Sequence, residues 1–239
     1  MQLNNNKILI TGGGTGIGLG LAERFLQEGN DVIIIGRRNE TLEAAKAKHP
    51  QLIIHACDIE NESGRIDLFH WIQEQHPDTN VLINNAGIQN WMDVSDIDFY
   101  ERAKQELAIN IEAPLHLISL FLKAETLTTI MNVSSGLSYV PLAKVPVYSA
   151  TKSFIRSFTT SIQKTLGNTI EVIEIIPPAL NTDLGGVGLH DSYPPVSEFI
   201  TSIFEQLKEG KNKLTFGMSD MMAKASSTDL ENVFNRMNP

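Results

Sequence analysis

A tyrosine and a lysine separated by three residues are the clearest candidates for chemistry in this sequence. Tyr148 and Lys152 belong to the segment YSATK, within a pattern that predicts a helix from about Val147 to Leu166. Residues four positions apart share one face of a helix, so the ammonium group can approach the phenol. A free tyrosine has a pKa of about 10, and a nearby positive charge lowers the pKa by favouring the phenolate. The spacing allows a proton-transferring tyrosine, but taken alone it is more typical of an ordinary pair on a solvated helix.

A serine upstream of this pair supplies a hydroxyl group. Ser135 follows the strand candidate Thr129–Val133 and Ser134. At the end of a strand, its hydroxyl group can donate a hydrogen bond to a carbonyl oxygen.

A glycine-rich segment near the N-terminus indicates a phosphate-binding turn. It reads TGGGTGIG from Thr11 to Gly18 and lies between the apolar run Lys7–Thr11 and a helical pattern. Glycine lets the backbone approach a ligand closely, and the free N–H groups at a helix start face an anion. The spacing is Gly-x-x-x-Gly-x-Gly, and no Gly-Lys-Ser/Thr follows as in a P-loop. A tight strand-to-helix turn without a ligand is the competing interpretation.

Two arginines follow the second predicted strand. Ile35 is succeeded by Gly36, Arg37 and Arg38, with no carboxylate. In an NAD site an Asp or Glu in this region accepts hydrogen bonds from the ribose hydroxyls. A carboxylate would repel a 2′-phosphate, whereas a guanidinium can bind it with two hydrogen bonds. After a phosphate-binding turn the arginines favour NADP(H) over NAD(H); two solvated arginines are the alternative.

The elements that must position these residues alternate between short β-branched runs and helix-length segments. Predicted strands cover Lys7–Thr11, Val32–Ile35, Leu52–His55, Val81–Ile83, Thr129–Val133, Ile170–Ile176 and Lys213–Phe216. Predicted helices cover Leu19–Glu28, Glu40–Lys48, Ile66–Gln75, Asp96–Lys123, Val147–Leu166, Glu198–Lys208 and Thr228–Arg236. The order predicts an α/β fold with a Rossmann-type doubly wound parallel sheet between two helix layers. No linker is visible, so we expect one domain over residues 1–239, with 183–212 as a substrate-binding loop and helix region.

Seven sequence segments, taken in order, resemble the short-chain dehydrogenase/reductase superfamily over nearly the whole chain. They are TGGGTGIG at 11–18, CDI with Asp58, NNAG at 84–87, NIEAP with Asn110, VSSG at 133–136, YSATK at 148–152 and PPALNT at 177–182. Each segment alone is weak evidence. Together, at the usual spacings of that family, they are specific.

The resemblance implies a role for each matching residue. Tyr148 matches the general acid/base, Lys152 the residue that lowers its pKa, and Ser135 the carbonyl-polarising hydroxyl. Asn110 matches the residue that holds a proton-relay water. Implied cofactor-binding residues are Gly12, Thr15, Gly16, Ile17, Gly18, Arg37, Arg38, Asp58, Ile59, Asn85, Ala86, Gly87, Tyr148, Lys152, Pro177, Leu180 and Thr182. The resemblance also implies a homodimer or homotetramer built on the two long helices.

A proline supports the role of Asn110 independently. Pro114 lies four residues after Asn110 and has no N–H group, so the carbonyl of Asn110 loses its helical partner. A freed carbonyl inside a helix can hold a water molecule. A simple kink in a long helix is the alternative.

The match departs from the family pattern after the sixth strand. The family usually has Pro-Gly there, whereas this chain has Pro177-Pro178. The second proline removes an N–H group, which puts contacts carried over to Leu180 and Thr182 in doubt. The Pro-Pro form and the tail ASSTDLENVFNRM resemble the bacterial branch named after the D-alanine–lipoteichoic acid gene cluster.

The resemblance implies a small carbonyl or alcohol compound as substrate, and its identity is open. Candidate pocket residues are Ile88–Met92, Ser138–Val140, Val145 and Leu184–Tyr193. Their mixture of aromatic and aliphatic side chains indicates a partly apolar group. Substrate loops vary most between relatives, so the roles of their residues are the least safely carried over from one relative to another.

Two other classes of function compete for the same residues. Ser149 and Lys152 form the Ser-x-x-Lys of penicillin-interacting enzymes, but the partner motifs Ser-Asp-Asn and Lys-Thr-Gly are missing, as is Gly-x-Ser-x-Gly. A non-enzymatic NADP(H)-binding regulator on the same fold is the stronger rival, since fold does not dictate function. The presence of both Tyr148 and Lys152 favours the enzyme.

Composition excludes several classes of partner. With 19 basic and 28 acidic residues in 239, the net charge is −9, which disfavours nucleic-acid and anionic-membrane binding. Cys57 is the only cysteine, so neither a disulfide nor a cysteine–zinc cluster can form within the chain, and the six histidines show no His-Glu-x-x-His; we expect no metal. The N-terminus lacks a basic region followed by an apolar one, and no apolar run approaches 20 residues. We therefore expect a cytoplasmic protein.

Overall fold

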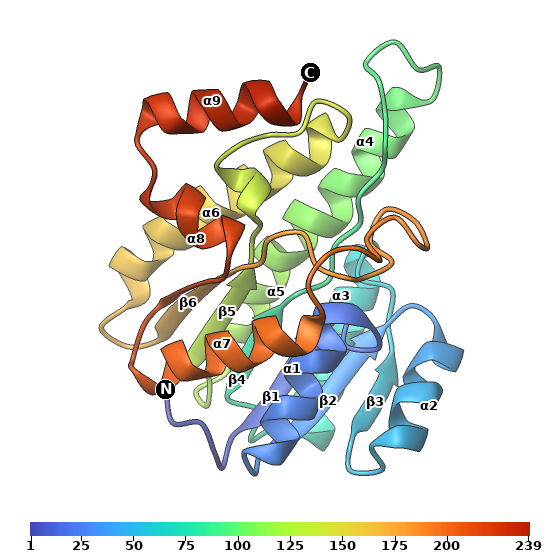
Figure 1. Cartoon of the computed structure of the whole chain (residues 1–239). Coiled ribbons are helices and arrows are strands. Elements are labelled where there is room, and N and C mark those ends of the chain that lie inside the picture. Colours follow the sequence, from blue (N-terminus) through green and yellow to red (C-terminus); the bar gives the residue numbers. More distant parts are fainter.

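Seven parallel strands form the centre of the molecule (Figure 1). The computed structural model describes residues 1–239. The strands are β1 (Lys7–Thr11), β2 (Asp31–Gly36), β3 (Ile53–Ala56), β4 (Val81–Asn84), β5 (Thr129–Val133), β6 (Glu171–Ile176) and β7 (Lys213–Thr215). Their spatial order is β3-β2-β1-β4-β5-β6-β7. The order reverses direction between β1 and β4, which confirms the predicted doubly wound sheet. In such sheets ligands bind outside the carboxyl ends of the strands at the point of reversal.

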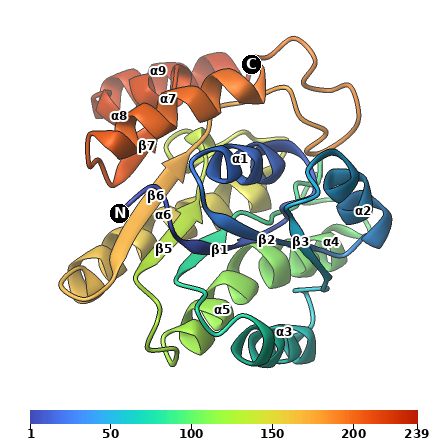
Figure 2. The same cartoon turned by 90° about the horizontal axis from the view of Figure 1, so that it is seen from below.

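Helices cover both faces of the sheet, as Figure 2 shows. They are α1 (Gly16–Gln27), α2 (Asn39–Lys48), α3 (Glu62–Gln75), α4 (Phe99–Leu107), α5 (Ala113–Phe121), α6 (Pro146–Leu166), α7 (Val196–Lys208), α8 (Met218–Lys224) and α9 (Ser227–Met237). The helices α1, α2 and α7 pack on one face, and α3, α5 and α6 on the other. No helix of the structure has both the length and the apolar character needed to cross a membrane.

The strands contribute side chains to two separate apolar cores, because successive side chains of a strand point to opposite faces of the sheet. In β1, Ile8 and Ile10 join the core under α1 and α7, while Leu9 joins the core under α3 and α5. All three are fully buried. Strands buried on both faces read as continuous apolar runs, which explains why these segments could be predicted as strands of a parallel sheet.

The long helix predicted over Asp96–Lys123 is interrupted. The chain forms α4, then a π-helical turn at Ala108–Glu112, then α5. The N–H of Ala113 bonds to the carbonyl of Ala108, five residues earlier. The missing N–H of Pro114 accounts for this irregularity, because the regular bond to Asn110 cannot form.

The same helix begins later than predicted. Aspartates before Phe99 bond to nearby backbone instead: Asp96 accepts from the N–H of Asp93, and Asp93 accepts from that of Ser95. Such local bonds compete with a helix. The short helix α8 was not expected from the sequence at all.

Candidate active site

The turn after β1 leaves no space for side chains. Gly12 has a φ of +64°, and a Cβ there would lie 2.9 Å from the Cα of Ala86. A Cβ on Gly18 would lie 2.2 Å from the carbonyl oxygen of Gly12. The turn is supported from β4 by Asn85, whose side-chain amide donates to the carbonyls of Thr11 and Gly12. The glycine spacing therefore serves close backbone packing.

The first turn of α1 carries unshared N–H groups next to a hollow. Thr15 is the N-cap, its side chain makes no capping bond, and no acidic residue lies in the first turn. The hollow measures about 490 Å³ and is lined by Gly14, Thr15, Gly16, Leu19, Glu40, Thr41, Ala44, Ala45 and Lys48. Free N–H groups and the positive end of the helix dipole suit an anion such as a phosphate.

Arg37 and Arg38 are exposed immediately after β2. The structure shows no ion pair or side-chain hydrogen bond for either guanidinium group. Arg38 is also the N-cap of α2, which places it beside the hollow described above. Both groups are therefore available to an anion.

The segment after β3 is held by hydrogen bonds between its side chains and nearby backbone atoms. Asp58 accepts a hydrogen bond from the N–H of Glu60 at 3.1 Å, and Ile59 is buried in the core under α3. The preceding Cys57 is half-buried and its Sγ donates to the carbonyl of Gly64 at 3.4 Å. Burial raises the pKa of this thiol to about 11, helped by the charges of Asp58 and Asp67.

Four polar residues of the predicted catalytic group are buried near one another. Tyr148 and Lys152 on α6 are each 5% exposed, Ser135 after β5 is 8% exposed, and Asn110 in the π-helical turn is 2% exposed. The ammonium nitrogen of Lys152 lies 5.6 Å from the centre of the Tyr148 ring. A Cβ on Gly87 would lie 3.3 Å from Asn110 Oδ1 and 3.4 Å from Lys152 Nζ, so the segment after β4 borders the same group.

The electrostatics of Tyr148 differ from the sequence prediction. Burial raises the pKa of Tyr148 well above its usual value, the hydroxyl of Ser135 partly offsets this, and the charge of Glu106 raises the pKa further. The prediction of a lowered pKa was therefore wrong for this structure. Its physical reason is desolvation, which disfavours the phenolate and which the Tyr-x-x-x-Lys spacing cannot reveal.

Lys152 is likewise controlled by burial. Its Nζ donates to the carbonyl oxygen of Val133 at 2.9 Å. Burial lowers the pKa of Lys152 from 10.5 to about 8. At neutral pH most of these side chains still carry a positive charge next to the phenol.

Asn110 connects two segments of the site. Its Oδ1 accepts from the N–H of Ile88 at 2.9 Å, and its Nδ2 donates to the carbonyl of Ile88 at 2.9 Å. Nδ2 also lies 3.2 Å from Thr151 Oγ1, which in turn donates to the carbonyl of Tyr148. The side chain thus ties the segment after β4 to the helix that carries Tyr148.

Comparison with known proteins agrees with this geometry. Residues 6–189 match the family model described as short chain dehydrogenase. The chain is 38% identical to the uncharacterized oxidoreductase DltE of Bacillus subtilis, over 100% of this chain and 98% of that protein. This chain belongs to the short-chain dehydrogenase family. It is therefore an oxidoreductase by family.

One further sequence relative and two solved structures are also similar to this chain. The NADP-dependent 3-hydroxy acid dehydrogenase YdfG of Salmonella typhimurium is 29% identical over 71% of each chain. A short-chain dehydrogenase from Burkholderia cenocepacia, solved with NADP, has a TM-score of 0.85 at 24% identity and covers 99% of both chains. Another from Burkholderia phymatum, solved with NAD, has a TM-score of 0.83 at 17% identity over 100% of this chain and 99% of that one. Solved members of this fold thus hold either dinucleotide.

The Pro-Pro segment after β6 remains close to the glycine turn despite its departure from the family pattern. Pro177 is buried and its carbonyl accepts from the N–H of Gly136. Leu180 is 3% exposed and joins the core under α7. The side chain of Thr182 lies 3.5 Å from the place where Gly16 would carry a Cβ. Thr182 is therefore adjacent to the start of α1, whereas Leu180 is committed to the core.

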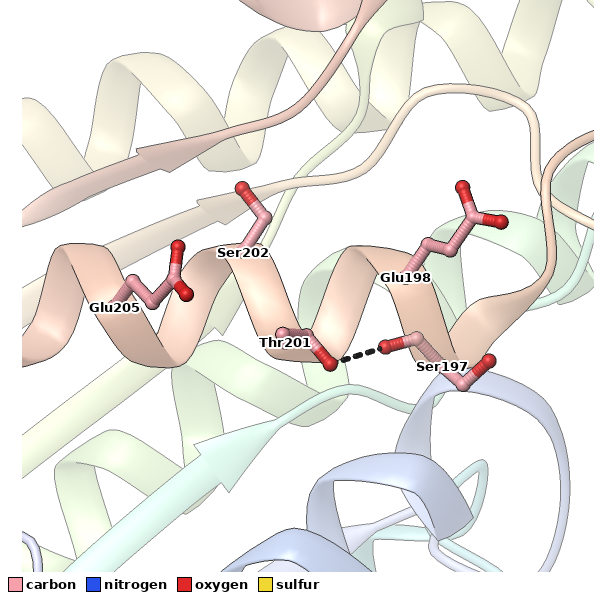
Figure 3. A pocket seen from close by; sticks show the side chains of 5 residues that line it. All are labelled: Ser197, Glu198, Thr201, Ser202 and Glu205. Atoms are coloured by element: carbon pink, nitrogen blue, oxygen red, sulfur yellow. Dashed lines mark hydrogen bonds between the residues drawn. The ribbon is translucent and has the colours of Figure 1, made fainter.

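Helix α7, which we expected to belong to the substrate-binding region, packs against α1. Its inner face contributes Phe199, Ile203 and Phe204 to the core. Its outer face bears a hollow of about 310 Å³ lined by Ser197, Glu198, Thr201, Ser202 and Glu205 (Figure 3). Two carboxylates and no basic group make this hollow unsuited to phosphates. None of the predicted site residues lines it.

Two charged residues near the site escaped the sequence analysis. Glu106 on α4 is completely buried, and its charge acts on Tyr148. Arg102 lies one turn earlier and donates to the carbonyl of Trp91 at 2.7 Å. Their spacing of four residues from each other and from Asn110 was the available signal, because it puts all three on one helix face.

Proposed function

We propose that this protein is an NADP(H)-dependent oxidoreductase that acts on a small carbonyl or alcohol compound, with Tyr148 as general acid/base. The observation that carries the proposal is the burial of Tyr148, Lys152, Ser135 and Asn110 in one group beside Gly87. When bound, the nicotinamide cofactor supplies a hydride to a carbonyl carbon or accepts one from an alcohol carbon.

Tyr148 moves the proton that accompanies this reaction. In the reducing direction, its hydroxyl gives a proton to the carbonyl oxygen, on which negative charge develops. The raised pKa keeps the phenol protonated at neutral pH, which is the form needed for this step. In the oxidising direction the same oxygen must take the proton, and the ammonium group of Lys152 stabilises the phenolate that precedes it.

Ser135 and Asn110 have positioning roles in this proposal. The oxygen of Ser135 accepts from the N–H of Leu137 at 3.1 Å, which leaves its own proton for the substrate oxygen. Asn110 holds the segment after β4 against α6, and we propose that its carbonyl holds the water through which Tyr148 exchanges protons with solvent. The bonds made by its side chain keep the π-helical turn in register with α6.

The residues at the nucleotide end fit a dinucleotide phosphate. Gly12 and Gly18 form a turn into which no side chain could fit, and free N–H groups follow in α1. Arg37 and Arg38 would hold a 2′-phosphate, since neither has another anionic partner in the chain. The NADP dependence of the relative YdfG supports the same preference. We propose that Asp58 and Ile59 border the adenine, that Asn85, Ala86 and Gly87 line the cofactor, and that Thr182 approaches its phosphates.

We also propose one domain over residues 1–239 and a homo-oligomer. Both apolar cores share one sheet, which supports a single domain. Leu107 on α4 and Phe154 on α6 are each 41% exposed, and these neighbouring helices offer an apolar surface to a second copy. Light scattering coupled to size exclusion measures the mass, and a monomer at micromolar concentration would contradict the oligomer.

A screen of cofactor turnover tests the proposed function. The purified protein is mixed with NADPH or NADH and a panel of ketones and aldehydes, and with NADP⁺ or NAD⁺ and the matching alcohols, while nicotinamide absorbance is recorded. We expect turnover with NADPH and at least one carbonyl compound. NADPH binding without any turnover across the panel would favour a regulator instead. Turnover with NADH alone would contradict the cofactor assignment.

A further inference from the structure

The segment Ile88–Trp91, which we name the wall segment, connects β4 to the protruding loop before α4. It borders the proposed site at several points. Asn110 binds both backbone groups of Ile88, and Met92, the next residue beyond the segment, donates its N–H to the carbonyl of Lys144, four residues before Tyr148. A Cβ on Gly185 would lie 2.8 Å from Gln89 Nε2. The wall segment therefore lies between the catalytic group and the loop after β6.

One helix face holds this segment at three successive places. Asn110 binds Ile88, Glu106 Oε1 accepts from the N–H of Asn90 at 2.5 Å, and Arg102 donates to the carbonyl of Trp91 at 2.7 Å. The three side chains are spaced by four residues along α4 and the π-helical turn, so they form one line on the helix. In Figure 1 the chain after β4 rises beside α4.

Burying the polar and charged groups of these three side chains costs solvation free energy, which a purely structural contact would not require. Glu106 is fully buried, and its Oε2 has no hydrogen-bond partner in the chain. Asn90 Nδ2 and Arg102 Nε are buried without partners too, so three of the five such atoms in the protein gather here. Apolar side chains would fix a loop with less loss of solvation. The arrangement is better explained by a role in the site.

Charges around Glu106 connect it to the catalytic tyrosine. Burial raises the pKa of its carboxyl, while the backbone N–H of Asn90 and the charge of Arg102 lower it. Its charge also acts on Tyr148. Arg102 is itself paired with Asp96 and Asp98 at 2.6 Å each, which anchors it to the protruding loop.

We propose that Glu106 and Arg102 are positioning residues that fix the wall segment against the catalytic group and thereby shape the substrate side of the pocket. Asn110 belongs to both the wall contacts and the Tyr148 contacts, so a shift of the wall segment is transmitted to α6. The pocket role rests on the proposed oxidoreductase function. The mechanical link, by which Glu106, Arg102 and Asn110 hold the wall segment, does not depend on that function. It can be measured without a substrate.

Hydrogen exchange measures this link at single amides. Glu106→Leu removes the acceptor of the Asn90 N–H, and exchange at that amide should become at least about tenfold faster, a low estimate for losing a hydrogen bond to a charged group. Exchange at Ile88, which Asn110 holds, should change less. Glu106→Gln keeps an oxygen acceptor and should restore protection at Asn90. Glu101→Gln, an exposed change of the same charge on the same helix, is the matched control and should leave both amides unchanged.

Two results would overturn the proposal. The first is unchanged exchange at Asn90 in folded Glu106→Leu, and the second is an equal rise at the amides of β5, which would make Glu106 a general stabilising residue. If Glu106→Leu does not fold, Arg102→Met serves instead, because Arg102 is partly exposed. In a Trp71→Phe background, where Trp91 is the single tryptophan, Arg102→Met should increase the quenching of Trp91 fluorescence by acrylamide; unchanged quenching would overturn the proposal.

A kinetic measurement tests the pocket role separately. With any carbonyl compound that is turned over, Glu106→Leu should raise KM and leave the Kd for NADPH unchanged, and Glu106→Gln should restore KM. An unchanged KM together with loosened exchange would remove the pocket role and keep the mechanical link. Absence of turnover in the wild-type protein would count against the proposed function alone.

Discussion

Glycines at the two ends of the site have different surroundings. In the turn after β1, the neighbours of Gly12 and Gly18 are backbone atoms at 2.9 and 2.2 Å from where a Cβ would stand. In the loop Leu184–Tyr193, Gly188 has a φ of +79° and its nearest neighbour is a side-chain oxygen of Asp191 at 3.8 Å. Glycine at the nucleotide end faces backbone atoms, whereas the glycines of this loop face open space or side-chain atoms, such as Gln89 Nε2 at 2.8 Å from where Gly185 would carry a Cβ.

This difference indicates how the fold divides its work. The proposed nucleotide end is built largely from backbone atoms, which suits phosphates that NADP and NAD have in common. The substrate end is built from side chains on exposed loops, such as Val187 at 87% exposure and Tyr193 at 45%. Side chains can be exchanged without disturbing the sheet, which suits a site whose substrate differs between relatives.

The largest effect is expected at Tyr148, where the two ends meet. Tyr148→Phe removes the proton that the reaction needs, so turnover should fall by at least about 100-fold, the low end for general acid–base catalysis. The Kd for NADPH, measured by fluorescence, should stay nearly the same because the change removes one hydroxyl and leaves the glycine turn and Arg37 untouched. Retained turnover would contradict the role of Tyr148. A weakened Kd would show that the two ends are not independent.

A pH-dependent effect is expected at Lys152. Its pKa is lowered from 10.5 to about 8, so the folded protein binds fewer protons than the unfolded chain within that window. Stability from this group is fully present above 10.5 and is lost as the pH falls through about 8. The free energy of unfolding of the wild type, relative to Lys152→Met, should therefore rise by roughly 3 kcal/mol from pH 8 to pH 10.5. Urea unfolding at several pH values measures this, and a difference that stays flat or falls would contradict it.

The rigidity of the nucleotide end is tested at Gly18. Gly18→Ala places a methyl group against a backbone carbonyl, and such overpacking typically costs about 1–3 kcal/mol. We expect weaker NADPH binding by about tenfold and a lower stability in urea. Gly36→Ala is the matched control, since its Cβ would lie 3.6 Å from Leu42, an ordinary contact. Equal effects of the two changes would refute the argument from packing.

The choice of dinucleotide is tested at Arg37. Arg37→Asp replaces a free cation with an anion near the proposed 2′-phosphate, and the Kd for NADPH should rise by about tenfold. The Kd for NADH, which lacks that phosphate, is the internal control and should not rise. An unchanged Kd for NADPH would mean that Arg37 does not select the cofactor.

The smallest effect is expected at the tip of the substrate end. Val187→Ser changes an exposed side chain, so the free energy of unfolding should stay within about 0.5 kcal/mol of the wild type. The Kd for NADPH should also be unchanged, while KM for apolar carbonyl compounds should rise. A loss of stability of several kcal/mol would show that this loop is part of the packed structure.

The sequence predicted the sheet well because its strands are buried on both faces. A run such as Val32–Ile35 can hardly be placed elsewhere, and the glycines between 12 and 18 stand where the backbone is too crowded for a Cβ. The interruption at Ala108–Glu112 was also within reach, since a proline removes one specific N–H group. Covalent and steric constraints of this kind are local, so they can be read from neighbouring residues.

The remaining features depend on distant partners. Glu106 and Arg102 bind backbone atoms of Asn90 and Trp91. Contacts of a side chain with a distant backbone cannot be predicted from the pattern of side chains along the sequence. The pKa of Tyr148 is set by the depth at which α6 is buried, whereas the spacing to Lys152 describes only one neighbour. Helix α8 is short and was missed because a seven-residue segment has little periodicity.

The protonated thiol of Cys57 has a practical consequence for labelling the protein with dyes. Burial raises the pKa of Cys57 to about 11, so this thiol is almost entirely protonated near neutral pH, and the thiolate is the form that reacts with alkylating dyes. A second cysteine introduced at Val187 would be exposed and would react far faster. The natural chain can thus be labelled at one chosen site of the substrate loop without first removing its own cysteine.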